Sequence, residues 1–352
     1  MRGASQKDRQ ISETGMPLEI ETPARARPPA LHRHPAEAVP IVIGLVNNMP
    51  DAALHSTEAQ FSSLLGAAAR TLPVRLRFSS FPELPRAAEA RDHIARGYWP
   101  IDDLMADPPD ALIVTGTEPR APRLRDEPYW ERSVALLAFA EEHTLTSIWS
   151  CLAAHAAVLN LDGIERRRLQ EKRCGVYAHS VLAGHALLAG VSSPLSMPHS
   201  RWNELSPEAL RAAGYTLLSW SAETGADAFA RERRTLMLFF QGHPEYEDAT
   251  LLKEYRRDVG RYLNSQQPHY PTLPHGYLTP EATAVLTHFR ERAEARREAA
   301  LLEQFPFATV AATLRNTWRP AAVAIYRNWL AWIAHARAPT RAAEAVSLAS
   351  YE

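Results

Sequence analysis

Cysteine is scarce in this chain, long apolar runs are absent, and neither sign of charge is in excess. The 352 residues include two cysteines, Cys151 and Cys174, so no disulfide framework is indicated and a reducing compartment fits better. No apolar run is long enough to span a bilayer, and the N-terminus lacks the apolar core of a signal peptide. The 39 basic and 40 acidic residues give a net charge of −1, which offers no basic surface for nucleic acid or an anionic membrane. We therefore expect a soluble, cytoplasmic protein.

The composition changes along the chain and suggests three regions. Residues 1–38 are polar and proline-containing without a usable apolar period, which predicts a disordered or loosely attached extension. Residues 39–263 carry the apolar patterns of a large domain. Residues 264–352 begin with a proline-rich linker and continue as C-terminal helices that we expect to dock on the core.

The central region alternates between strand and helix patterns. Continuous apolar runs at 39–46, 111–116 and 235–242 are typical of strands buried on both faces. Amphipathic segments, at 56–69 and 129–142 for example, indicate helices between them. This order predicts an α/β fold, a mostly parallel sheet with helices on both faces. Ligands in such folds bind at the carboxyl ends of the strands.

Less regular segments give weaker predictions. Residues 165–173 are strongly charged and are expected to form a solvated face, with a β segment following at 175–179. Residues 197–202 are crowded with polar groups and predict a loop. Residues 281–304 predict a single charged helix at the surface.

Cys151 stands at the junction of a strand pattern and a helix pattern. The β-type residues 147–149 precede it, and an alanine-rich helical segment, 152–159, follows at once. A cysteine at such a turn has its sulfur exposed at the end of the sheet and lies at the positive end of a helix dipole, which favours the thiolate. A buried structural cysteine is an equally good interpretation of this stretch alone.

His243 and Glu245 provide the groups that a catalytic cysteine needs. They follow the apolar run 235–242, so both side chains are expected at the same edge of the sheet as Cys151. A nearby histidine holds or restores the thiolate and moves protons, and a carboxylate fixes the tautomer of that histidine. The order strand, cysteine, helix, then strand, histidine and glutamate favours a catalytic triad of Cys151, His243 and Glu245.

Further motifs accompany Cys151, His243 and Glu245 along the chain. They are Met49-Pro50, Thr57-Glu58-Ala59-Gln60-Phe61, Leu112 to Gly116, Tyr129-Trp130, Cys151 to Ala157, Gly163-Ile164, Glu171-Lys172, Gly175 to His179, Pro198 to Arg201, Gly242 to Tyr246, Thr250-Leu251 and Glu254 to Asp258. Any one motif would be weak, but their order and spacing are specific. In them the chain resembles the homoserine O-succinyltransferase family, some members of which use acetyl donors. The resemblance runs from about residue 39 to residue 258, with a weaker echo near Asn328.

The resemblance implies a fold, a reaction and a set of partners. The fold is that of class I glutamine amidotransferases. The reaction is ping-pong transfer of an acyl group from acyl-CoA, through a cysteine acyl-enzyme, to the hydroxyl of L-homoserine on the route to methionine. No bound cofactor or metal is implied, because acyl-CoA is a co-substrate. Two-fold association, as a homodimer, is a further implication for which the sequence itself gives no sign.

Residue roles carry over from the family motifs. Cys151 would form the acyl-enzyme, His243 would act as general acid and base, and Glu245 would orient it. Lys172 and Ser200 would line the substrate site, and Arg257 would pair with the carboxylate of the acceptor. The amide of Leu152 and a donor from the Gly116–Thr117 turn would bind the oxyanion.

Two positions leave the family pattern and bear on the acyl donor. Asp51 follows Met49-Pro50 where the family usually has lysine. Arg120 stands where succinyl enzymes carry a small residue and acetyl enzymes an acidic one. An arginine there would either pair with the free carboxylate of a succinyl group, or fill the pocket, or point to solvent. Succinyl-CoA is the favoured hypothesis, and acetyl-CoA is the alternative.

Three other interpretations stay open. Serine is an alternative acceptor, because one methylene is discriminated by only about 10–200-fold. A glutamine amidotransferase-like hydrolase uses similar residues, although no synthetase-like domain follows and the residues 115–119 replace the usual glycine-rich oxyanion loop. A non-catalytic binding protein of this fold would not need Cys151, His243 and Glu245 together.

Overall fold

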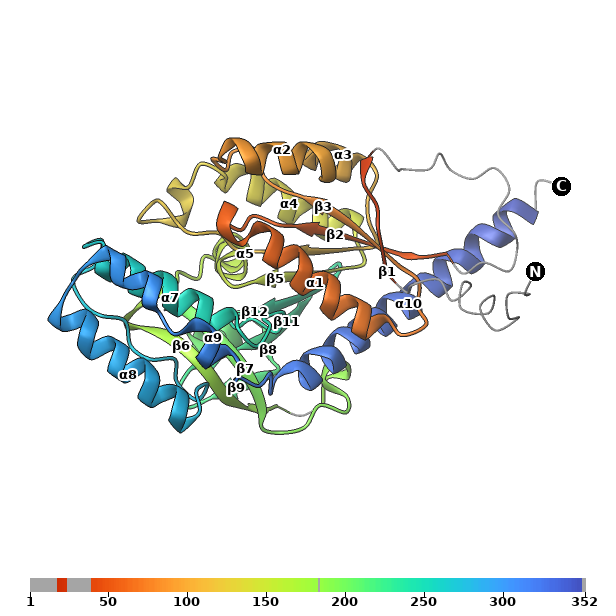
Figure 1. Ribbon diagram of the computed structural model, residues 1–352. Coiled ribbons are helices and arrows are strands. Elements are labelled where there is room, and N and C mark those ends of the chain that lie inside the picture. Colours follow the sequence, from red (N-terminus) through yellow and green to blue (C-terminus); the bar gives the residue numbers. More distant parts are fainter. Residues whose placement is uncertain (1–17, 24–38, 183, 350–352) are drawn as a thin grey trace, which may run out of the picture.

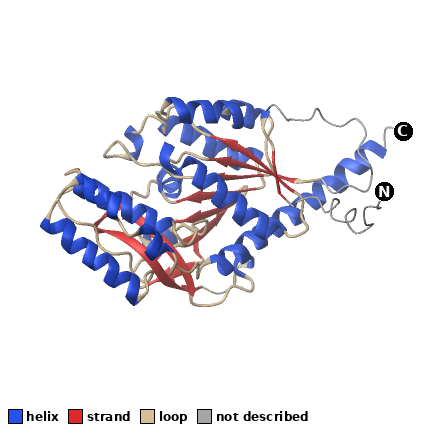
Figure 2. Cartoon of the chain, in the orientation of Figure 1, coloured by secondary structure: helices blue, strands red, loops and turns tan. Residues whose placement is uncertain are grey.

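A large, mostly parallel β-sheet forms the centre of the molecule (Figures 1 and 2). The computed structural model describes residues 18–23, 39–182 and 184–349. The strands of the sheet lie in the order β1-β3-β2-β4-β5-β12-β11-β8. Their bounds are β1 (Leu18–Ile20), β2 (Ile41–Val46), β3 (Val74–Ser79), β4 (Ala111–Val114), β5 (Thr146–Ser150), β8 (Thr216–Leu217), β11 (Ala228–Glu232) and β12 (Leu236–Phe240).

The pairing of these strands confirms the predicted fold class. Every neighbouring pair from β1 to β12 is parallel, and only the β12–β11 and β11–β8 pairs are antiparallel. The strands alternate between two apolar clusters. Ile113 and Ile148 pack on one face, whereas Leu112 and Trp149 pack on the other. Burial on both faces explains why these strands are continuous apolar runs.

Helices cover both faces of the sheet. On one face lie α1 (Leu54–Ala69) and α10 (Arg319–Ala349), and on the other lie α4 (Trp130–His143) and α5 (Leu152–Asp162). Trp329 of α10 is fully buried, and its indole nitrogen donates to Thr146 Oγ1 at 3.1 Å. The C-terminal helix is thus held against β5, the strand that leads to Cys151. No helix within the described residues is long and apolar enough to cross a membrane.

A smaller antiparallel sheet and three helices form a second layer of structure beside the carboxyl-end loops (Figure 1). Its strands lie in the order β10-β9-β6-β7. A third apolar cluster joins the helices of this region. The elements are β6 (Arg167–Val181), β7 (Leu195–Glu204), β9 (Ser219–Ser221), β10 (Gly225–Ala226), α7 (Thr250–Leu263), α8 (Pro280–Ala295) and α9 (Phe307–Ala311). The remaining helices are α2 (Ala88–Gly97), α3 (Ile101–Ala106) and α6 (Pro207–Ala212).

Two local predictions, for residues 197–202 and 281–304, are wrong, whereas the solvated face expected at 165–173 is confirmed. Residues 197–202 form part of β7 rather than a loop, because their polar side chains find buried partners across the sheet. The charged residues 167–173 are exposed for the most part, as expected, but belong to the long strand β6. The single helix expected over 281–304 ends at Ala295, and a 3₁₀ segment, Ala299–Gln304, follows.

Part of the N-terminal extension belongs to the main sheet. Residues 18–20 pair in parallel with β3, and Glu21 accepts a hydrogen bond from Arg77 Nε at 2.7 Å. The expectation of a disordered or loosely attached segment is therefore wrong for residues 18–23. Residues 1–17 and 24–38, which share that prediction, lie outside the described residues.

Candidate active site

Cys151 lies in a strained turn between β5 and α5. Its φ of +53° falls in the left-handed region, which a non-glycine residue adopts only where the surrounding structure enforces it. Its amide donates to the carbonyl of Phe240 at 2.7 Å, which fixes the turn against the end of β12. Cys151 is partly exposed and directly precedes the first turn of α5, so it lies at the positive end of the helix dipole.

His243 and Glu245 lie beside Cys151, as the sequence led us to expect. His243 Nδ1 and Glu245 Oε1 are 2.9 Å apart, and both side chains are buried. Burial acts to lower the pKa of His243, but the charges of Glu245 and Cys151 and hydrogen bonds to both raise it well above its usual value. The arrangement therefore supports a thiolate–imidazolium pair oriented by a buried carboxylate.

The Gly116–Thr117 turn approaches the start of α5 closely enough to form an oxyanion site. A Cβ atom on Gly116 would lie 2.9 Å from the amide nitrogen of Leu152 and 2.8 Å from its Cβ. As the first residue of α5, Leu152 has an amide with no acceptor inside the helix. The structure thus places the two predicted donors, Leu152 and the turn containing Thr117, side by side.

The predicted substrate residues Lys172, Ser200 and Arg257 gather around two acidic side chains of α7. Lys172 Nζ lies 2.6 Å from Asp258 Oδ2 and 3.7 Å from Glu254 Oε2. Arg257 pairs with Asp258 at 2.9 Å, and the Ser200 hydroxyl donates to Glu254. The group holds cations and carboxylates together, which suits a ligand carrying both an ammonium and a carboxylate group.

Tyr246 connects this charged group to the triad. Its ring stacks on the imidazole of His243, with 4.2 Å between centroids, and its hydroxyl donates to Glu254 Oε1 at 2.5 Å. The sequence shows Tyr246 only as part of a motif and gives no indication of this bridging position. A substrate bound between Lys172 and Arg257 would therefore lie beside Glu254 of α7, the residue that accepts a hydrogen bond from the tyrosine stacked on the imidazole.

A buried polar network supports the turn that carries His243. Asp227 accepts a hydrogen bond from the Gly242 amide at 2.8 Å, and it lies 3.7 Å from His199 Nε2. The His243 amide donates to the carbonyl of Pro198 at 2.9 Å. Desolvation and the neighbouring Arg201 keep the pKa of His199 well below its usual value, so this histidine is neutral and structural.

Arg120 and Asp51, which depart from the family pattern, line one pocket of about 570 Å³ together with Arg86 and Thr117. The Arg120 side chain is exposed, and its amide donates to the buried carboxylate of Glu127 at 2.8 Å. Asp51 forms an ion pair with Arg86 at 3.1 Å. Arg86 therefore places a positive charge close to Asp51, the position where the family usually has lysine, but this charge is already paired with Asp51.

Arg166 is a cation near Cys151. The sequence does not single it out, because it lies in a run of arginines. Its pKa is lowered by desolvation and is influenced by Tyr129, Glu127 and Cys151. Its Nη1 atom is buried and has no hydrogen-bond partner among the described residues. A guanidinium in that state favours an anionic ligand.

Comparisons with known proteins give the family of this chain. A family model described as homoserine O-succinyltransferase matches residues 32–340. The homoserine O-succinyltransferase of Methylorubrum extorquens is 46% identical to this chain, in a match that covers 83% of this chain and 86% of the relative. That of Rhodopseudomonas palustris is also 46% identical, and the match covers 84% of this chain and 89% of the relative. That of Bradyrhizobium japonicum is 44% identical over 90% of this chain and 96% of its own. A glutamine amidotransferase structure from Thermotoga maritima covers 84% of this chain and 99% of its own, at 10% identity and a TM-score of 0.45, too distant to bear on activity. The chain belongs to the homoserine O-succinyltransferase family.

Proposed function

We propose that this protein transfers a succinyl group from succinyl-CoA to the hydroxyl of L-homoserine, in methionine biosynthesis, through an acyl-enzyme on Cys151. Family membership carries the reaction type and the substrates. The arrangement of Cys151, His243 and Glu245 is the observation that carries the mechanism. The reaction needs no bound cofactor, since acyl-CoA enters as a co-substrate.

In the first half-reaction the Cys151 thiolate attacks the thioester carbonyl. The developing oxyanion would lie between the Leu152 amide and the Gly116–Thr117 turn, which approaches Leu152 too closely for a side chain on Gly116. The tetrahedral intermediate collapses as the C–S bond to CoA breaks. His243 donates its proton to the leaving CoA thiolate, and Cys151 carries the succinyl group.

In the second half-reaction His243, now neutral, accepts the proton of the acceptor hydroxyl as that oxygen attacks the acyl-cysteine carbonyl. The C–S bond to Cys151 breaks, and the thiolate–imidazolium pair is restored. Glu245 holds the imidazole in the tautomer that presents Nε2 to the substrate. The acceptor carboxylate would pair with Arg257 and Lys172, and its ammonium group with Glu254 or Asp258.

The preference for succinyl over acetyl rests on two arginines, Arg120 and Arg166. Arg120 lines the pocket beside Thr117, and the partnerless Nη1 of Arg166 is buried in the neighbourhood of Cys151. Either guanidinium would pair with the free carboxylate of a succinyl group, whereas acetyl offers no such charge. We expect Arg166→Ala to reduce kcat/KM for succinyl-CoA at least tenfold without a comparable loss for acetyl-CoA. Arg168→Ala, on the exposed part of β6, is the matched control.

A matrix of donors and acceptors tests the proposed substrates. CoA release is followed with succinyl- or acetyl-CoA as donor and with homoserine or serine as acceptor. The proposal predicts the highest kcat/KM for succinyl-CoA with homoserine. Equal or better use of acetyl-CoA would overturn the choice of donor, and equal use of serine would overturn the choice of acceptor. Two-fold association stays a prediction of the family resemblance, and a cytoplasmic location stays a prediction of the amino-acid composition.

A further inference from the structure

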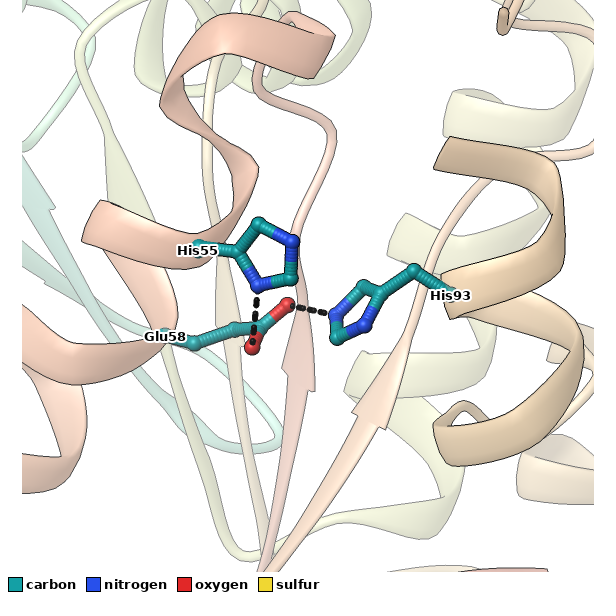
Figure 3. Close-up of side chains that lie close together, drawn as sticks. All are labelled: His55, Glu58 and His93. Atoms are coloured by element: carbon teal, nitrogen blue, oxygen red, sulfur yellow. Dashed lines mark hydrogen bonds and ion pairs between the residues drawn. The ribbon is translucent and has the colours of Figure 1, made fainter. Parts of the chain in front are cut away.

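Two histidines and a glutamate converge on one point at the N-terminal end of α1, outside the proposed triad. His55 and Glu58 project from the first turns of α1, and His93 projects from α2 toward them (Figure 3). Each residue offers a ligand atom, and these atoms lie within 4.8 Å of one another. His93 Nε2 is 2.7 Å from Glu58 Oε1, and His55 Nδ1 is 3.8 Å from Glu58 Oε2.

The donor set and its spacing match a transition-metal site. Two imidazoles and one carboxylate are the protein ligands of many zinc sites that keep an open position, and ligand atoms around tetrahedral Zn²⁺ lie about 3.4 Å apart. The His55–Glu58 atoms, 3.8 Å apart, and the widest pair of the set, at most 4.8 Å apart, need to close by about 0.4 and up to about 1.4 Å, whereas the His93–Glu58 pair, at 2.7 Å, needs to open by about 0.7 Å. Rotation of His55 supplies this movement, since its side chain is 68% exposed.

The contacts behind the cluster hold its carboxylate in place. The Tyr98 hydroxyl donates to Glu58 Oε1 at 2.7 Å and itself accepts from Asn47 Nδ2 at 3.0 Å. Metal-bound carboxylates are usually oriented by such outer hydrogen bonds. The two imidazole rings lie 4.0 Å apart, centroid to centroid, around a single carboxylate. Two protonated rings at that distance would repel each other, whereas one divalent cation would satisfy both nitrogens and the carboxylate.

We propose that His55, Glu58 and His93 bind one divalent transition-metal ion, with Zn²⁺ the best match, and that the ion fastens α2 to the start of α1. Water or an exogenous ligand would occupy the fourth position, on the exposed side of His55. Binding requires neutral imidazoles, so it releases any proton these nitrogens carry. None of the three ligands belongs to the triad or to the charged group of α7, so the ion would take no direct part in acyl transfer.

The test is a Zn²⁺ titration of the full, untagged chain after treatment with a chelator. The Cys151→Ala variant is used throughout, because a reactive thiolate beside His243 would itself bind Zn²⁺. We expect one Zn²⁺ per chain by calorimetry, with binding at least tenfold weaker in His55→Ala and in His93→Gln. His288→Ala is the matched control. His288 forms the same i, i+3 pair with a glutamate, Glu291, at the same 3.8 Å, but is not part of a three-ligand group among the described residues.

Two results would overturn the proposal. One is the absence of saturable Zn²⁺ binding to the Cys151→Ala chain. The other is a Zn²⁺ affinity in His55→Ala and His93→Gln that equals the affinity of the His288→Ala control. Co²⁺ substitution gives a second readout that a general effect on stability would not change. Tetrahedral Co²⁺ absorbs strongly in the visible range, and this absorption should disappear in His55→Ala. Because the His55 side chain is 68% exposed, its removal should not unfold the protein, so loss of the absorption would report loss of a ligand.

Discussion

Replacing Glu245 by glutamine should abolish most acyl transfer while leaving the size and shape of the side chain almost unchanged. In the present structure the Glu245 carboxylate lies 2.9 Å from His243 Nδ1, and both groups are buried. Two unit charges about 3 Å apart interact by roughly 5–6 kcal/mol at an effective dielectric constant of about 20. The amide keeps part of this energy as a dipole, so we expect a loss of about 10³–10⁴ in the rate of acyl transfer.

Rapid mixing with succinyl-CoA alone measures formation of the acyl-enzyme, the step whose rate the Glu245→Gln change should lower. The variant removes the charge that stabilises the His243 imidazolium, so formation of the acyl-enzyme and release of CoA should both slow by the full factor. Glu247→Gln is the control, because Glu247 lies two residues further along the chain and is exposed. Thermal unfolding of both variants separates a catalytic effect from a loss of fold.

A Glu245→Gln variant that keeps acyl-enzyme formation within tenfold of the wild-type rate would refute this reasoning. It would show that the buried carboxylate does not act on the imidazole. The triad would then reduce to Cys151 and His243, and the raised pKa of His243 would need another source.

Three further predictions concern neighbouring parts of the site. Gly116→Ala should lower kcat by about 10²–10³, because the new methyl group would lie 2.8–2.9 Å from Leu152, whereas Gly97→Ala, with open space around it, should have no such effect in the same assay. Arg257→Lys should raise KM for homoserine about tenfold and leave acylation by succinyl-CoA alone unchanged, because it removes a planar fork from the acceptor site but nothing from the thiol. The raised pKa of His243 stabilises the fold fully below about pH 6.5, its unfolded value, and this stabilisation is lost as pH rises through the folded pKa. In a Cys151→Ala background, where no thiolate offsets the proton on His243, the free energy of unfolding should therefore fall above pH 6.5 by up to about 1.4 kcal/mol per pH unit more steeply with Glu245 than with Glu245→Gln, as denaturant titrations would show.

The patterns that depend on local sequence predict the fold well. Strands such as Ile41–Val46 and Leu236–Phe240 are buried on both faces, so nearly every residue in them is apolar and the run can be recognised in the sequence. The positions of Cys151 and His243 follow from the rule that parallel strands end at one edge. Their place in the sequence, each directly after a strand pattern, is therefore enough to predict that the two side chains meet.

Features that depend on long-range pairing could not be predicted. Strand β7 contains Pro198, His199 and Arg201, which read as a loop because their burial depends on partners far along the chain. His199, for example, lies 3.3 Å from His179 of β6, and Arg201 donates to the carbonyl of Thr224 at 2.6 Å. Local propensity carries no information about such partners.

The same limit applies to the residues that complete the site. Tyr246 bridges the imidazole of His243 and the carboxylate of Glu254 through a stack and a hydrogen bond that only the folded chain brings together. Arg166 stands in a run of charged residues, for which a solvated surface is the usual interpretation. The cluster of His55, Glu58 and His93 draws ligands from two helices, so no spacing in the sequence reveals it.

The central claim is that Cys151 carries the acyl group, and intact-protein mass spectrometry tests it most directly. The protein is mixed with succinyl-CoA in the absence of any acceptor, quenched in acid and digested to locate the modification. The account predicts one succinyl group per chain, on Cys151, which disappears when homoserine is added before the quench and never forms in Cys151→Ala. Transfer of succinyl to homoserine by the wild type without an adduct on Cys151, or transfer by Cys151→Ala at an undiminished rate, would contradict it.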